Sequence, residues 1–113
     1  MQRGDVYLAP FLYADLEAAK RRPVCVVSGE AFNEGPDVLV AMVTSRRARL
    51  EAPGIGDVAL QDWEAARLLV PSTLRAGRLQ TIEFRRLDGR LGSLSPGDLR
   101  ATDDALRAVL ELT

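Results

Sequence analysis

Two apolar runs of strand length stand out in the first half of the chain. They span residues 23–28 and 38–44 and are rich in valine, which is typical of strands covered on both faces. The polar segment between them has the composition of a wide turn. If this hairpin is symmetric about Asn33, Arg22 pairs with Thr44, and the two Cβ atoms lie about 4.5–5.5 Å apart on one face of the sheet.

Shorter pieces of strand-like sequence predict the rest of a sheet. They fall at residues 5–9, 58–60, 72–75, 79–83 and 90–94. Pro10 ends the first of these pieces.

The segments between the strands are predicted to be irregular. Residues 11–22 form a long loop with room for one helical turn, and the basic stretch 45–56 is broken by proline and glycine. Asp62 is a candidate N-cap for a brief helix at residues 63–67.

The end of the chain predicts an amphipathic helix. Ser95 is its N-cap, Pro96 its first helical residue, and the Asp98 side chain reaches back to complete a capping box. The side chains on its apolar stripe are Leu99, Thr102, Leu106, Val109 and Leu110.

Length and composition fit one domain spanning residues 1–113. The 113 residues are 47% hydrophobic, which is enough for a core of ordinary size. With many short strands and one long helix, the pattern predicts a mainly β fold of the α+β class, with the helix laid over a small barrel.

The charge pattern restricts any site for a polyanion to a local patch. Lysine and arginine number 15 against 16 acidic residues, so the net charge is −1 and the chain as a whole does not attract nucleic acid. Every basic residue except Lys20 is arginine, whose planar group suits phosphate. High GC content of the coding sequence explains this bias equally well.

Several chemistries are excluded or disfavoured by residue counts. The chain has no histidine and one cysteine, Cys25, within an apolar run, so it lacks a histidine-based nuclease site and an internal disulfide. We expect no metal and no cofactor. No apolar stretch approaches the roughly 18 residues of a membrane span, so we expect no membrane association and a cytoplasmic location.

The order and spacing of several short motifs resemble the MazF/PemK family of type II toxins. The resemblance covers nearly the whole chain. It is carried by R-G-D-V-Y at residues 3–7, Glu17 followed by R-R-P-V-C-V-V-S at 21–28, A-M-V-T-S at 41–45, T-I-E at 81–83 and R-L-G-S-L-S-P at 90–96.

This resemblance implies an SH3-like small β-barrel that forms a homodimer. It further implies a metal-independent endoribonuclease that cuts single-stranded RNA at short sequences and is inhibited by a cognate antitoxin protein. By position in the motifs, Arg22 and Thr44 correspond to the catalytic pair, in agreement with the hairpin register derived above. The remaining residues expected to contact RNA are Glu17, Arg21, Ser45, Arg46, Arg47, Arg78 and Gln80.

RNA carries its own nucleophile, which limits what the protein must supply. Attack by the 2′-hydroxyl leaves a 2′,3′-cyclic phosphate and a 5′-hydroxyl, so the protein has to align the chain and stabilise charge on the phosphoryl oxygens. The Arg22 guanidinium and the Thr44 hydroxyl can do this by hydrogen bonding. The sequence does not identify the group that accepts the proton.

Plainer interpretations of the same residues stay open. Arg22 and Thr44 could be ordinary strand residues, and a run of charge such as residues 46–49 is usually a solvated surface. Glu17 could orient Arg22 or lie in solvent. The aromatic residues Phe11, Tyr13 and Trp63 could stack on bases or pack in the core.

Three segments depart from the family pattern. Residues 15–19 lack the usual glycines, residues 77–80 read G-R-L-Q where the family usually has [DE]-Q-[IV]-R, and residues 61–67 look inserted. Two other functions therefore remain: a CcdB-like gyrase poison, which the absence of an aromatic C-terminal tail argues against, and a non-catalytic module that only binds its antitoxin.

Overall fold

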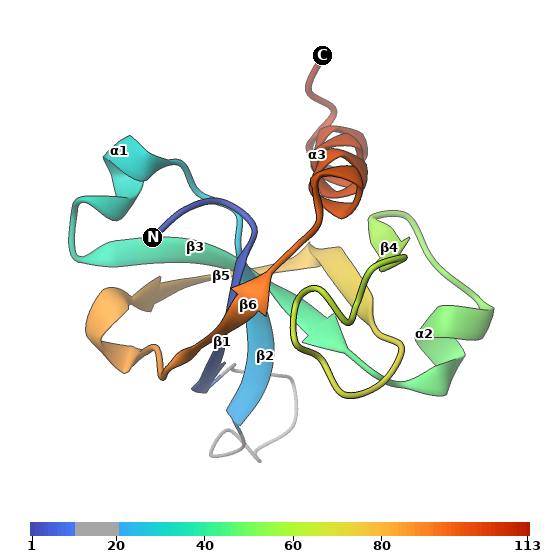
Figure 1. Ribbon diagram of the computed structural model, residues 1–113. Helices are drawn as coiled ribbons and strands as arrows, with labels where there is room; N and C mark the ends of the chain where they lie inside the picture. The colour runs from blue at the N-terminus through green and yellow to red at the C-terminus, as the bar shows by residue number, and fades with distance from the viewer. Residues whose placement is uncertain (11–20) are drawn as a thin grey trace.

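The computed structural model describes residues 1–10 and 21–113. Six strands form one curled antiparallel sheet in the order β4-β5-β3-β2-β1-β6 (Figure 1). The strands are β1 (Asp5–Pro10), β2 (Arg21–Val26), β3 (Asp37–Thr44), β4 (Asp57–Ala59), β5 (Thr73–Glu83) and β6 (Arg90–Ser93). The helices are α1 (Glu30–Asn33), α2 (Arg47–Glu51) and α3 (Pro96–Leu110), with a 3₁₀ turn, η1, at Phe84–Arg86.

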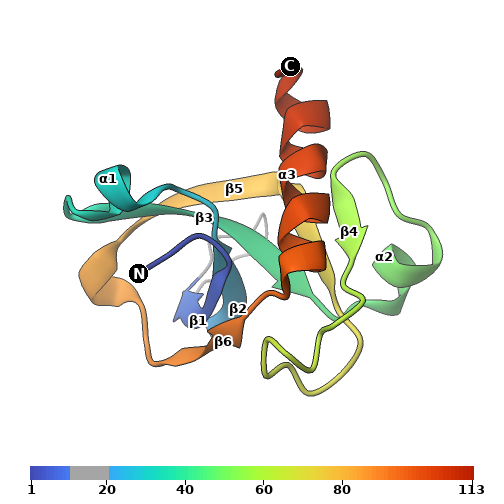
Figure 2. The same cartoon turned by 45° about the horizontal axis from the view of Figure 1, so that its top comes forward.

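The helices cover different parts of the sheet. The long C-terminal helix α3 packs against β4 and β5 (Figure 2), while the short helices α1 and α2 lie at opposite ends of β3. The predicted mainly β fold with a C-terminal helix is therefore confirmed. None of these helices is long and apolar enough to cross a membrane.

The predicted register of the central hairpin is confirmed. Val24 lies opposite Met42 and Val26 opposite Val40, as expected for a hairpin centred on Asn33. The ladder ends at Val24 and Met42, two residues before Arg22 on β2 and Thr44 on β3.

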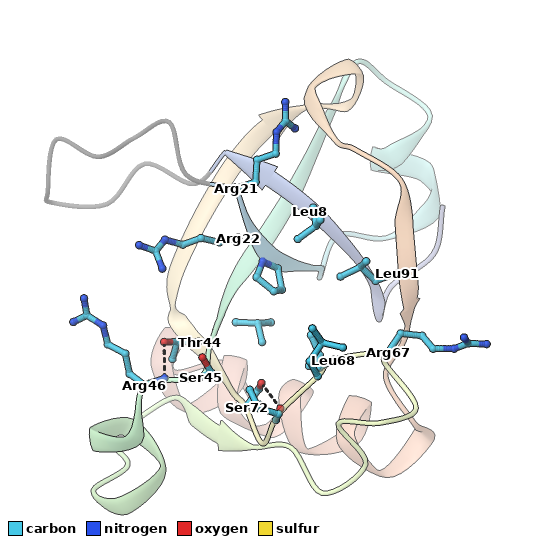
Figure 3. A pocket seen from close by; sticks show the side chains of 14 residues that line it. Leu8, Arg21, Arg22, Thr44, Ser45, Arg46, Arg67, Leu68, Ser72 and Leu91 are labelled. Atoms are coloured by element: carbon cyan, nitrogen blue, oxygen red, sulfur yellow. Dashed lines mark hydrogen bonds between the residues drawn. The ribbon is translucent and has the colours of Figure 1, made fainter.

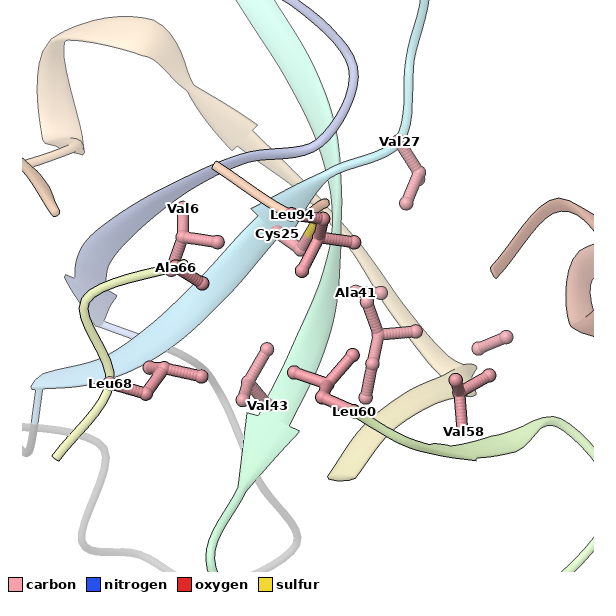
Figure 4. Packing of buried hydrophobic residues seen from close by; sticks show 12 residues of the cluster. Val6, Cys25, Val27, Ala41, Val43, Val58, Leu60, Ala66, Leu68 and Leu94 are labelled. Carbon is pink, nitrogen blue, oxygen red and sulfur yellow. The ribbon is translucent and has the colours of Figure 1, made fainter. Parts of the chain in front are cut away.

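Both faces of the central strands are buried, as the valine-rich runs predict. Cys25, Ala41 and Val43 point into one apolar cluster, which the segment carrying Leu60 and Leu68 covers (Figure 4). Their neighbours Val24, Val26, Val38, Val40 and Met42 belong to a second cluster. Alternation along a strand sends successive side chains to opposite faces, so β2 and β3 separate the two clusters.

The predicted connections were partly wrong. The turn between β2 and β3 contains α1, and the basic stretch after β3 contains α2. Residues 63–67 form successive turns instead of the expected helix, and the last of them, Arg67, has a left-handed backbone with φ of 61°. Most of the long loop predicted at 11–22 lies outside the described residues, and its last two residues begin β2.

One long strand replaces the two short strands predicted at 72–75 and 79–83. Within β5 the pairing with β3 shifts: Ala41 faces Leu79, whereas its neighbour Met42 faces Arg75. Residues 76–78 are therefore additional on the β5 side, which bends the strand. The bend leaves the first part of β5 paired with β3 on one side and β4 on the other.

The start of α3 confirms one capping prediction and corrects another. The Ser95 hydroxyl accepts a hydrogen bond from the Asp98 backbone N–H at 3.2 Å, as predicted. The Asp98 carboxylate does not reach back to Ser95: it accepts bonds from the backbone N–H groups of Gln61 at 3.0 Å and Asp62 at 2.8 Å. Asp98 is 2% exposed, so this buried carboxylate fixes the start of the segment that follows β4. On the predicted apolar stripe, Leu110 is half exposed.

Candidate functional site

A cavity of about 430 Å³ opens at the end of the central hairpin where β2 begins and β3 ends. We call it the arginine pocket. Its lining is contributed by β1, β2, the end of β3, the segment 67–72 and β6. The lining residues are Leu8, Arg21, Arg22, Pro23, Val43, Thr44, Ser45, Arg46, Arg67, Leu68, Leu69, Val70, Ser72 and Leu91.

Arg22 and Thr44 both line this pocket. Figure 3 shows their functional groups on the same side of the cavity, together with the Arg46 side chain. Arg22 is partly buried and Thr44 is 8% exposed. The backbone N–H of Arg46 donates to Thr44 Oγ1 at 3.2 Å. Because a hydroxyl can accept and donate at once, this bond leaves the Thr44 proton available to donate to a bound group.

The opposite side of the pocket is apolar. Leu8, Leu68 and Leu91 face Arg22 and Thr44 across the cavity in Figure 3. At the rim, Leu69 is 93% exposed and Val70 is 48% exposed. Leucine and valine side chains are usually buried. A ligand that covers this exposed rim would bury them, so the rim is suited to holding an apolar part of a ligand.

Two structural features place this apolar wall. Asp98 anchors the start of the segment at Gln61 and Asp62, as described above. Further along, Gly92 of β6 lies against the backbone of Ala66: a Cβ at position 92 would be 2.8 Å from the Ala66 carbonyl carbon. A side chain there would push the wall outward, because such a contact is closer than packed carbon atoms allow.

The pocket is a local concentration of positive charge. Its lining contains four arginines and no aspartate or glutamate among the described residues. Arg21 is paired with Asp88, and Arg67 points away from the cavity in Figure 3. Arg22 and Arg46 lie on the Thr44 side of the cavity, in a chain whose net charge is −1.

The remaining residues predicted to contact RNA are only partly brought together. Ser45 and Arg46 line the pocket, whereas Arg47 lies outside the lining and pairs with Glu51 at 2.7 Å. Arg78 and Gln80 lie in β5, outside the lining. Glu17, like the aromatic residues Phe11 and Tyr13, falls outside the described residues.

For Trp63 and for the residues of the apolar wall, residue type alone does not show whether the side chain packs in the core or lines the pocket. Trp63 packs against the apolar cluster below α3, which favours its core interpretation over base stacking. Leu69 and Val70 line the pocket but carry no signal that separates them from core residues. A wall formed through distant contacts such as the Asp98 hydrogen bonds is not visible in a local pattern.

The ionisable chemistry of the pocket is restricted to arginine. Among the described lining residues, arginine is the only ionisable type, and none of these residues can accept a proton near neutral pH. The Cys25 side chain lies in the apolar cluster and does not line the pocket. Burial raises the pKa of its thiol to about 12. In residues 1–10 and 21–113, no three metal-binding side chains gather.

Solved structures of similar shape share this fold. An endoribonuclease in complex with its cognate antitoxin from a mycobacterial species has a TM-score of 0.79 and 24% identity, covering 100% of this chain and 97% of that one. The Mycobacterium tuberculosis toxin MazF-mt6 has a TM-score of 0.75 and 22% identity, covering 96% and 98%. MazF in a MazE–MazF complex from Deinococcus radiodurans has a TM-score of 0.74 and 20% identity, covering 100% and 97%.

Membership of a family rests on the sequence itself. Residues 2–110 match the model of the PemK-like, MazF-like toxins of type II toxin–antitoxin systems. The match confirms the resemblance seen in the motifs of Arg22 and Thr44, and it covers nearly the whole length of the chain. The chain therefore belongs to the PemK-like, MazF-like toxin family.

Proposed function

We propose that this protein is an endoribonuclease toxin that cuts single-stranded RNA in the arginine pocket. The observation that carries the proposal is the placement of Arg22 and Thr44 on one side of a cavity with four arginines and no acidic lining residue in the described chain. A phosphodiester is the anion that such a pocket favours, because arginine pairs with two phosphate oxygens at once.

In the proposed reaction the RNA attacks itself. The 2′-oxygen forms a bond to phosphorus while the bond from phosphorus to the 5′-oxygen breaks, leaving a 2′,3′-cyclic phosphate and a 5′-hydroxyl. The 2′-hydroxyl gives up its proton to the solvent, and the departing 5′-oxygen takes one up from the solvent. Arg22 and Thr44 stabilise the charge that develops on the two non-bridging oxygens.

The apolar side of the pocket favours unpaired RNA. Leu68 and Leu91 line the cavity opposite Arg22 and Thr44, and Leu69 also lines it, so a base held out of a stack can contact these side chains. A base within a duplex is not free to do so, since it must first be unpaired and unstacked. The pocket therefore selects single strands without reading a duplex groove.

The partners follow from the family and from the relatives of known structure. We propose that the chain pairs with a second copy of itself and is inhibited by a cognate antitoxin, as the mycobacterial endoribonuclease was solved with its own antitoxin. The cytoplasm, where messenger RNA is translated, is the proposed location.

The proposal is tested by incubating the purified protein with a long single-stranded RNA in the presence of EDTA. We expect cuts at a small set of sequences, with cyclic phosphate on one product and a free 5′-hydroxyl on the other. Intact RNA, or cutting that the chelator abolishes, contradicts the proposal. Intact RNA combined with tight antitoxin binding would support a non-catalytic module instead.

A further inference from the structure

Thr73, in the first part of β5, carries a buried hydroxyl that the fold does not satisfy. Its side chain is 0% exposed, and its Oγ1 atom has no hydrogen-bond partner within the described residues. A buried hydroxyl without a partner loses its bonds to water and gains nothing in return. Such a group in a folded protein calls for a reason beyond packing.

The position of Thr73 relates it to the proposed catalytic pair. Thr73 lies directly opposite Thr44 in the pairing of β3 with β5, so the two side chains share one face of the sheet. The pairing of β2 with β3 ends at Val24 and Met42, two residues before Arg22 and Thr44. Arg22, Thr44 and Thr73 thus come from three neighbouring strands: the first two line the pocket, and Thr73 is buried outside its lining.

We propose that Thr73 is a positioning residue that orients the Thr44 hydroxyl toward the phosphate. The inference rests on the proposed nuclease function and extends it to a residue outside the pocket lining. When RNA is bound, the Thr73 hydroxyl donates to Thr44 Oγ1, and the Thr44 hydroxyl donates to a phosphoryl oxygen.

The count of donors and acceptors at Thr44 supports this arrangement. Its hydroxyl has two lone pairs and one proton, and the Arg46 N–H already occupies one lone pair. A bond from Thr73 occupies the second. The proton is then the only bonding capacity that Thr44 has left, and it is directed away from both donors, toward the cavity.

The distance between paired strands allows the bond to form. Directly opposite residues place their Cβ atoms about 4.5–5.5 Å apart, and hydroxyl oxygens bond at about 2.7–2.8 Å. Rotation of the Thr73 side chain between its staggered positions can bring the two oxygens together without moving the strands. The backbone of Thr73 is held on both sides, by Thr44 of β3 and Ala59 of β4.

The test compares Thr73→Val with Thr73→Ser in steady-state cutting of a short RNA. Valine keeps the shape but removes the hydroxyl, so we expect kcat to fall about five- to tenfold, as for loss of one hydrogen bond in the transition state, with KM unchanged. We expect Thr73→Ser to restore kcat to within about twofold. Melting temperature should not fall in Thr73→Val, because the variant removes an unpartnered hydroxyl.

Two further variants separate positioning from structure. Thr102→Val is the matched control: Thr102 is also fully buried, but its hydroxyl donates to the Asp98 carbonyl at 2.9 Å within α3. It should lower the melting temperature and leave kcat unchanged. In a Thr44→Val background, Thr73→Val should have no further effect on kcat, because its target hydroxyl is gone.

The outcomes distinguish this inference from the function it rests on. If the unaltered protein cuts no RNA, both proposals fail. If it cuts and Thr73→Val cuts at the same rate, only the role of Thr73 fails. A loss of kcat that Thr73→Ser does not restore also overturns that role, since it would mark a packing defect.

Discussion

Two hollows at opposite ends of the same hairpin differ in charge. The arginine pocket, at the end where β2 begins and β3 finishes, is lined by four arginines and no acidic residue in the described chain. The second hollow, of about 270 Å³, lies at the turn end and is lined by Met1, Gln2, Glu30, Asn33 and Glu34. We call it the glutamate hollow. The net charge of −1 does not reveal that basic and acidic residues gather at different ends of the hairpin.

The difference shows how a nearly neutral chain can bind a polyanion at one place. Strand β3 separates the two ends by roughly 25 Å, at the usual rise of about 3.3 Å per residue. This exceeds the screening length of about 8 Å at physiological salt. Each end therefore acts on RNA by its own charges, so the arginine pocket attracts the strand while the glutamate hollow disfavours it.

The largest effect should come from removing the charge that lies next to Thr44. We expect Arg22→Ala to lower the rate of RNA cutting by at least about a hundredfold, as for loss of a group that stabilises transition-state charge. Its free energy of unfolding should stay within about 1 kcal/mol of the unaltered protein. Product formation on gels and thermal melting measure the two quantities.

A matched arginine at the other end provides the control. Arg85 is exposed and pairs with Glu83 at 3.0 Å, far from the pocket lining, so Arg85→Ala should cut normally. Equal losses of cutting rate in Arg22→Ala and Arg85→Ala would show that the total charge of the protein sets the rate. The claim that the two ends act separately on RNA would then be wrong.

A smaller effect is expected for Arg46, which lines the pocket beside Thr44. Arg46→Ala should weaken RNA binding and make the slope of log affinity against log salt shallower by about 0.7, the value for one phosphate contact on a single strand. Titrations at several salt concentrations measure this slope. The neighbouring Arg47 lies outside the lining and pairs with Glu51. Arg47→Ala should therefore leave the slope of log affinity against log salt unchanged.

The apolar rim should affect the choice of sequence more than the rate. We expect Leu69→Ser to change the relative cutting of different sequences by about three- to tenfold, because an apolar contact discriminates by about 1 kcal/mol. Mapping cut sites on a long RNA measures this. Ile55→Ser is the control, since Ile55 is also highly exposed at 86% but is absent from the pocket lining. An identical change in both variants would exclude a specific role for the rim.

The smallest effect should come from reversing the glutamate hollow. Replacing Glu30 and Glu34 together by lysine should strengthen RNA binding by about twofold, because exposed charges act weakly in water. Filter binding at low salt would detect it. The cut sites should not change, because the described residues that line the glutamate hollow include no threonine. New cut sites would contradict the assignment of the chemistry to the arginine pocket.

The central hairpin could be predicted because its signals are local. Valine-rich runs, one turn and the symmetry about Asn33 gave a register that the pairing of Val24 with Met42 confirms. The same register predicts Arg22 and Thr44 at one end of the hairpin, and both residues line the arginine pocket there. Cys25 was correctly expected to be buried because its neighbours are all apolar.

What the sequence could not reveal depends on contacts between distant segments. Residues 76–78 read as a break between two strands, yet β5 absorbs them as a bend while pairing with the same partner. The pattern at Ser95 indicated a capping box, but the Asp98 carboxylate instead holds backbone N–H groups more than thirty residues earlier. Neither the wall of the pocket nor the orphan hydroxyl of Thr73 has a signature in composition or spacing.

The Asp98 contact has a consequence for synthesis of the protein. The wall of the cavity comes from the middle of the chain, but the carboxylate that anchors it belongs to the last helix. A growing polypeptide therefore has an unfinished cavity until α3 has left the ribosome. For a protein proposed to destroy messenger RNA, we expect such a delay to protect the transcript being translated, which a comparison of ribosome-arrested and released chains in an RNA-cutting assay would test.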